Sequence, residues 1–189
     1  MAAVLDAAHP AAHPAARTTE GGTEQVFAAA ALLGGALPAD ADRHLRAAGQ
    51  HYADDAQALR HLAAAAAAAP AHPAVLIGRY RFFFYKGCWA EALAVAGECL
   101  AWAARLLALP ADWHDTRPQQ AEFGAYHAVP ARFYLFTLKG YAYLSLRLGL
   151  LSDGQAAARK LLELDPADRV GGQVLLDVLR RLEQGDDDD

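Results

Sequence analysis

The sequence predicts an all-α fold. Hydrophobic residues make up 54% of the 189 residues and include many alanines, and alanine has the highest helix propensity of the common residues. The β-branched residues that favour strands are scarce. Apolar residues near the C-terminus recur at the spacing of one helix face, at Val170, Val174, Leu175, Val178, Leu179 and Leu182. A chain of this length can form one domain with a sizeable core.

The N-terminal third begins with a tail and continues with three predicted helices. Residues 1–22 repeat Ala-Ala-His-Pro and then contain threonine and glycine, a composition typical of disorder. Helices are expected over residues 23–34, 40–51 and 54–69. Asp54 or Asp55 caps the third of these helices, and Pro70 ends it.

An aromatic helix over residues 73–86 opens the rest of the chain and ends at a turn on Gly87. The elements expected next are a returning helix over 90–109, a connector over 110–130, helices over 131–148 and 152–164, a last helix from Pro166, and an acidic tail over 185–189. The connector is longer than an ordinary link between two helices, so it is predicted to be a lid or a partly ordered loop. Ser152 is the expected N-cap after a second turn at Gly149. Residues 23–184 should form a single domain.

Two segments share a short signature. Residues 87–93 (GCWAEAL) read small-x-aromatic-x-acid-small-aliphatic, and residues 149–166 (GLLSDGQAAARKLLELDP) repeat this frame. Both segments resemble the second half of a tetratricopeptide (TPR) repeat. The resemblance covers residues 41–182. It implies TPR-like antiparallel helical hairpins, stacked as a short right-handed α-solenoid with a C-terminal capping helix.

The chain departs from a regular TPR array in two ways. Gly87 and Gly149 are 62 residues apart, whereas adjacent standard units differ by about 34 residues. The family also has a small residue where the two helices of a hairpin cross. Ala142 fits this position in the later unit, but Tyr80 does not fit it in the earlier one.

The resemblance also implies a binding surface, because the first helix of each TPR hairpin lines the concave face. The ligand-facing positions of the family fall on Ile77, Arg81, Phe84, Tyr85, Phe136, Lys139, Tyr143 and Arg147. Aromatic walls with basic heads suit an acidic and apolar peptide, extended or helical. The aromatic cluster over residues 80–85 has a second interpretation, as core packing with Tyr80 and Phe83 as its expected core members.

Several other functions are not expected. No GxGxxG, P-loop or GxSxG motif occurs, so we expect neither an enzyme nor a cofactor. His44, His51 and His61 lie on neighbouring predicted helices, but no ligand motif accompanies them, and no metal site is expected. Without the four terminal aspartates the net charge of −5 becomes about −1, which argues against nucleic-acid binding. No signal peptide or membrane span is apparent, and Cys88 and Cys99 are expected to be reduced, as in a cytoplasm.

The leading hypothesis is a bacterial, cytoplasmic adaptor or assembly factor that binds a partner protein on its concave helix face. Residues 75–86 and 132–136 are also similar to small helical-repeat proteins encoded among bacterial nitrogen-fixation genes. Two alternatives remain open: a self-associating scaffold, and a small-molecule or metal site under the 110–130 connector that uses Trp113 and His114. The sequence leaves the oligomeric state undetermined.

Overall fold

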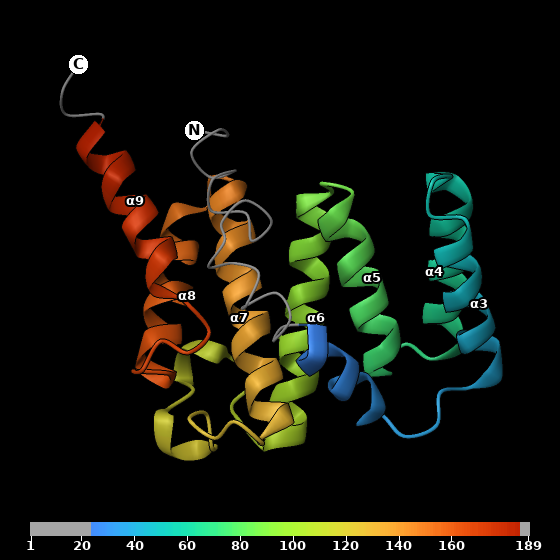
Figure 1. Ribbon diagram of the computed structural model, residues 1–189, viewed down its shortest axis with the longest axis horizontal. Coiled ribbons are helices and arrows are strands. Elements are labelled where there is room, and N and C mark those ends of the chain that lie inside the picture. Colours follow the sequence, from blue (N-terminus) through green and yellow to red (C-terminus); the bar gives the residue numbers. More distant parts are fainter. Residues whose placement is uncertain (1–23, 186–189) are drawn as a thin grey trace.

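The computed structural model describes residues 24–185, with side chains for residues 24–181 (Figure 1). The tail predicted over residues 1–22 and nearly all of the acidic tail predicted over residues 185–189 lie outside the described residues. Residues 24–185 form α-helices and 3-10 helices, and no strand occurs among them. The predicted all-α class is therefore confirmed for this part of the chain. None of its helices is long and apolar enough to cross a membrane.

The helices follow one another through short links, except for one long connector. A first helix covers residues 24–32. The later α-helices are α3 (Ala39–Gln50), α4 (Asp55–Ala68), α5 (Pro73–Tyr85), α6 (Trp89–Leu107), α7 (Val129–Arg147), α8 (Leu151–Leu164) and α9 (Gln173–Gly185). Two 3-10 helices, η2 (Trp113–Asp115) and η3 (Pro118–Gln120), lie in the connector between α6 and α7.

Helices that are neighbours in the sequence pack against each other in space. α3 packs on α4, α5 on α6, α6 on α7, and α7 on α8. They form a row that runs from α3 and α4 at one end to α9 at the other (Figure 1). The helix over residues 24–32 packs instead against α5 and α7.

Local sequence accounts for several helix ends. The Asp54 carboxylate accepts a hydrogen bond from the backbone N–H of Gln57 at 3.0 Å and caps α4. The turns after α5 and α7 are made by Gly87 and Gly149, as predicted, with φ angles of 72° and 78°. Glycine enters this left-handed region without the steric cost of a Cβ atom. Ser152, in contrast, lies inside α8 and is not its N-cap.

The last helix begins later than the sequence predicts. α9 starts seven residues beyond Pro166, and the residues between α8 and α9 form a loop. The buried carboxylate of Asp165 accepts a hydrogen bond from the backbone N–H of Val170 at 3.0 Å. Gly171 follows with a φ angle of 73°. The Asp-Pro signal therefore starts a turn stabilised by a side-chain hydrogen bond, which delays the helix.

α7 lies in the centre of the core. Residues 131–138 and 142–146 are buried, because α6 and α8 flank this helix and two other segments cover it. Thr116 and Phe123 of the connector contact Tyr134, and Phe27 of the 24–32 helix contacts Phe133. A helix surrounded in this way is apolar on nearly all sides and shows little amphipathic pattern.

Small residues allow α7 and α8 to approach closely. A Cβ atom on Gly154 of α8 would lie 3.1 Å from the carbonyl oxygen of Ala142 and 2.5 Å from Leu146 Cδ2 of α7. Ala142 is the small crossing position that the TPR resemblance implies for the later unit. The close approach of Gly154 and Ala142 explains why the sequence has no larger side chains there.

Tyr80 stands where a TPR hairpin has a small residue, and its large side chain faces a glycine on another helix. The Tyr80 hydroxyl of α5 lies directly against Gly140 of α7, where a Cβ atom would overlap it. Gly140 has no side chain, and this leaves room on α7 for the large side chain of Tyr80 at the crossing position of the earlier unit. Tyr80 is buried, as the core interpretation of the aromatic cluster predicts.

Candidate functional site

One face of the molecule receives another helix of the same chain. We define the α5–α7 face by Tyr80 and Arg81 of α5 and Phe133 of α7. The Phe27 ring of the 24–32 helix lies edge-on to both aromatic rings, with centroid distances of 6.0 Å to Tyr80 and 5.4 Å to Phe133. A carboxylate oxygen of Glu24 lies 3.0 Å from the Arg81 guanidinium. The contact thus joins an aromatic socket to an ion pair beside it.

Three of the predicted binding residues are buried in the isolated chain. Ile77 of α5 and Phe136 and Tyr143 of α7 all belong to the main hydrophobic core cluster. A side chain that is enclosed in the core has little surface left for a partner. In this conformation these three residues stabilise the packing of α5 and α7.

Phe84, Tyr85 and Arg147 form a second group near the turn between α5 and α6. Phe84 is half-buried and contacts Tyr143 and Trp89 at ring-centroid distances of 5.8 and 5.9 Å. Tyr85 is 57% exposed. The Arg147 guanidinium lies 5.1 Å from the centre of the Trp89 ring, in a cation–π contact. The structure therefore brings both predicted helices together at this edge of the molecule.

Lys139 has an internal partner. Its ammonium donates a hydrogen bond to the carbonyl oxygen of Val170 at 2.7 Å and so links α7 to the loop before α9. Burial lowers the pKa of Lys139, and the nearby Asp168 carboxylate partly offsets this effect. Of the predicted basic residues, Arg81 is the one that faces the 24–32 helix.

Sequence reasoning missed the role of residues 24–32 and of Phe133. The relevant signal was present, because Val26, Phe27 and Ala30 are spaced to lie on one helix face. Glu24 precedes the phenylalanine by three residues and lies on the same side of the helix. Their contacts on α5 and α7 depend on residues far away in the sequence, so the register of this helix could not be assigned from its own segment.

Three histidines converge on the α3–α4 pair, as their positions suggested. His44 Nδ1 and His61 Nδ1 are 3.1 Å apart, and the rings of His51 and His61 are stacked with a centroid distance of 5.7 Å. Among the residues that the structure describes, however, no group of three or more His, Cys, Asp or Glu side chains is arranged to hold a metal ion.

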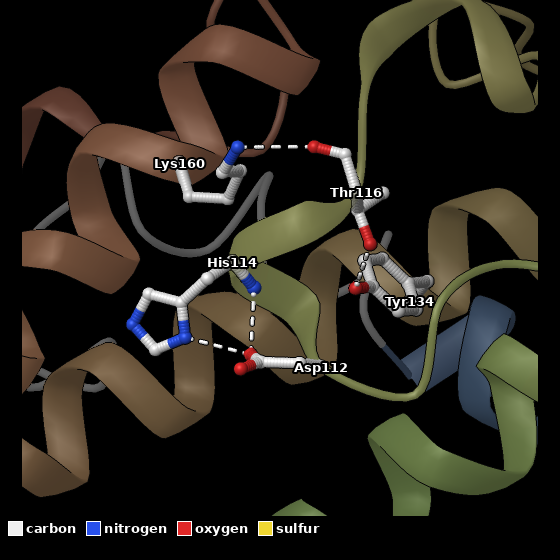
Figure 2. Close-up of polar contacts among 5 residues, drawn as sticks. All are labelled: Asp112, His114, Thr116, Tyr134 and Lys160. Atoms are coloured by element: carbon white, nitrogen blue, oxygen red, sulfur yellow. Dashed lines mark hydrogen bonds and ion pairs between the residues drawn. The ribbon is translucent and has the colours of Figure 1, made fainter.

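Contacts with α7 and α8 attach the connector to the core (Figure 2). The hydroxyl groups of Thr116 and Tyr134 are 3.0 Å apart and both buried side chains belong to the interior. The Lys160 ammonium of α8 donates a hydrogen bond to the carbonyl oxygen of Thr116 at 3.0 Å and pairs with Glu163 at 2.8 Å. These contacts fasten the connector to α7 and α8.

An exposed acid–base pair lies on the outer side of the connector (Figure 2). Asp112 accepts hydrogen bonds from the backbone N–H of His114 at 2.9 Å and from its Nδ1 at 2.7 Å, and these bonds lower the pKa of Asp112. Trp113 stacks on the His114 ring with a centroid distance of 3.5 Å. The two residues named for a possible small-molecule site thus contact each other.

A recess of about 520 Å³ adjoins this pair. It is lined by His114, Asp115, Arg117, Pro118, Gln119, Lys160 and Glu163. Both acidic and basic side chains line it, and Lys160 already has partners within the chain. This mixture gives the recess no single charge that would select an ion, and it has few of the apolar walls that small-molecule sites have.

Comparison with known proteins gives one similarity. No protein-family model matches the sequence, and no solved structure matches it. The chain is 40% identical over 116 residues to an uncharacterized 19.8 kDa protein in the nifW 5′ region of Azotobacter chroococcum mcd 1. The aligned segment spans 61% of this chain and 65% of that protein, slightly less than two thirds of its length.

Proposed function

We propose that this chain is a TPR-like adaptor or accessory protein, without enzymatic activity, that binds a partner protein through its α5–α7 face. Two antiparallel pairs, α5 with α6 and α7 with α8, support the TPR-like interpretation. Each pair is joined by a turn at a left-handed glycine, Gly87 or Gly149. Small residues at the α7–α8 crossing support it further. In this proposal the pairs stack as a short right-handed solenoid, and α9 caps its end.

The observation that carries the proposal is the helix seated on the α5–α7 face. A nine-residue helix already inserts an aromatic ring between Tyr80 and Phe133 and places a carboxylate on Arg81. A surface that accepts an apolar, acidic helix from its own chain has the shape and charge to accept one from another protein.

The cellular process in which this binding takes place is proposed from the similar Azotobacter protein. That protein's name gives its position in the nifW 5′ region, and this position is compatible with an association with nitrogen fixation. We propose that the present chain assists the assembly or maintenance of a nitrogen-fixation protein.

Affinity capture with crosslinking in the native host, during growth on dinitrogen, tests this function. Wild type is compared with Arg81→Glu and with Arg159→Glu, which makes the same charge change at an exposed position on α8. We expect Arg81→Glu to recover less of the captured partner, because the glutamate repels a partner carboxylate at the position where the Arg81 guanidinium attracts it. Arg159→Glu should recover the wild-type amount. Equal recovery with both variants, each folded by circular dichroism, would refute the assignment of this face.

A further inference from the structure

The 24–32 helix divides into an inner and an outer side. Val26, Phe27 and Ala30 are buried and belong to the main core cluster. Leu32 is 78% exposed, and the residues that follow the helix, 33–36, are exposed as well. The helix therefore lies on the surface of the molecule and is held by one side only.

The inner side fits the α5–α7 face through a ring and a charge. Phe27 is oriented at 77° to the ring of Tyr80 and at 66° to that of Phe133, so it is edge-on to one ring from each helix. Trp102 of α6 contacts the Phe133 ring at 5.6 Å and supports the socket from below. The ion pair of Glu24 with Arg81 lies about one helical turn away from the ring along the 24–32 helix.

This helix is not stable alone. Nine residues span about 13 Å, and isolated helices shorter than about 12 residues are marginal in water. Its stability must come from its contacts with α5 and α7, and its side chains are the first to be released if another helix takes the same contacts. The link after it is exposed over residues 33–36 and contacts the start of α5 through His72 and Pro73.

We infer that residues 24–32 are a resident substitute for the partner, and that the partner is an amphipathic helix of the same pattern. That pattern is an acidic residue, a phenylalanine three positions later and a small residue three positions after that, as in Glu24, Phe27 and Ala30. The partner helix binds by displacing residues 24–32 from the α5–α7 face. This inference rests on the proposed function and specifies both the partner and its competitor.

Displacement has a measurable consequence for affinity. A tethered helix competes at an effective concentration in the millimolar range. If it covers the face at least 90% of the time, the apparent dissociation constant of an incoming helix rises at least about tenfold. Releasing the resident helix should therefore increase the affinity for a probe by the same factor.

The probe is a fluorescent peptide with the sequence of residues 24–34, blocked at both ends, and binding is measured by anisotropy on the full chain. Phe27→Asp in the chain puts a charge into the aromatic socket and should release the helix. Leu32→Asp is the control, because it puts the same charge on the exposed side of this helix. We expect the peptide to bind Phe27→Asp at least about tenfold more tightly than wild type, and Leu32→Asp like wild type.

Altered peptides test the pattern itself. A peptide with alanine in place of Phe27 should lose at least tenfold in affinity for the released face. A peptide with lysine in place of Glu24 should also bind less tightly, and Arg81→Glu in the released chain should restore its binding. Rescue by charge reversal would not occur if the peptide bound only through nonspecific apolar contact.

Two outcomes overturn the inference. In one, the peptide binds wild type and Phe27→Asp with equal affinity although both are folded by circular dichroism, and the milder variant Phe27→Ala also binds it like wild type. The other is a wild-type dimer by light scattering that Phe27→Asp converts to monomer, because the occupant would then be the helix of a second copy. If the peptide binds as expected but host capture by the Phe27→Asp chain is insensitive to Arg81→Glu, the proposed function fails instead, because the released chain has no resident carboxylate on Arg81.

Discussion

Gly140→Ala tests whether the fit between Tyr80 and Gly140 determines how α5 and α7 pack. A Cβ atom at position 140 would overlap the Tyr80 hydroxyl and lie 3.3 Å from the ring carbon Cζ. Tyr80 is buried and contacts the rings of Phe27 and Phe84, so it has little room to move away.

Two opposing effects set the magnitude. Adding a methyl group to a tightly packed site typically costs about 1–3 kcal/mol. Replacing glycine by alanine inside a helix stabilises it by about 1 kcal/mol. Gly140→Ala should therefore lower the free energy of unfolding by about 0–2 kcal/mol in the wild-type background. With Tyr80→Phe the overlapping oxygen is absent, and the same substitution should become neutral or stabilising.

The assay is urea denaturation of the wild type, the two single variants and the double variant, followed by circular dichroism. We expect a coupling free energy of about 1–3 kcal/mol between the two substitutions, with unchanged m-values. Gly97→Ala is the matched control, because Gly97 lies within α6 and no atom is within 4 Å of a Cβ built there. It should stabilise the protein by up to about 1 kcal/mol in both backgrounds.

Additivity would refute the reasoning. If the Gly140→Ala and Tyr80→Phe effects add within about 0.5 kcal/mol, the two side chains do not share a packing constraint. A stabilisation by Gly140→Ala equal to that by Gly97→Ala would lead to the same conclusion.

Four further predictions concern other parts of the fold. Thr116→Val leaves the buried Tyr134 hydroxyl unpaired and should cost about 1–3 kcal/mol in urea denaturation, whereas adding Tyr134→Phe should recover most of this loss. Gly154→Ala should lower the free energy of unfolding by about 0–2 kcal/mol, because its Cβ atom would meet α7 at 2.5 Å and this cost exceeds the helix-propensity gain; a stabilisation equal to that by Gly97→Ala would show that the helices separate easily. Cys88 should react with iodoacetamide in the folded protein and the buried Cys99 only after unfolding, as read by mass spectrometry. Burial raises the pKa of Cys99 from 9.0 to about 12, so the thiol loses its proton in the unfolded chain at a lower pH than in the folded protein. The stability that the protonated Cys99 contributes should therefore be complete below pH 9 and lost as the pH rises to about 12. Cys99→Ala should flatten this part of the plot of unfolding free energy against pH.

The sequence by itself determined the all-α class and the two glycine turns, because these depend on neighbouring residues. A glycine in the left-handed region, as at Gly87 and Gly149, or an aspartate before a helix, as at Asp54, acts within one turn of backbone. Where a side-chain contact bridges several residues, local signals were insufficient. The bond from Val170 to Asp165 delayed α9 beyond the proline that should have opened it.

Only the tertiary structure decided which side chains are available for binding. Ile77, Phe136 and Tyr143 are suitable residues for a binding surface, but in the folded chain they are enclosed in the core. The seating of Phe27 on Phe133 joins positions more than a hundred residues apart. Helical periodicity identifies an apolar face but not the surface that covers it, because that depends on which distant helices the rest of the chain brings alongside.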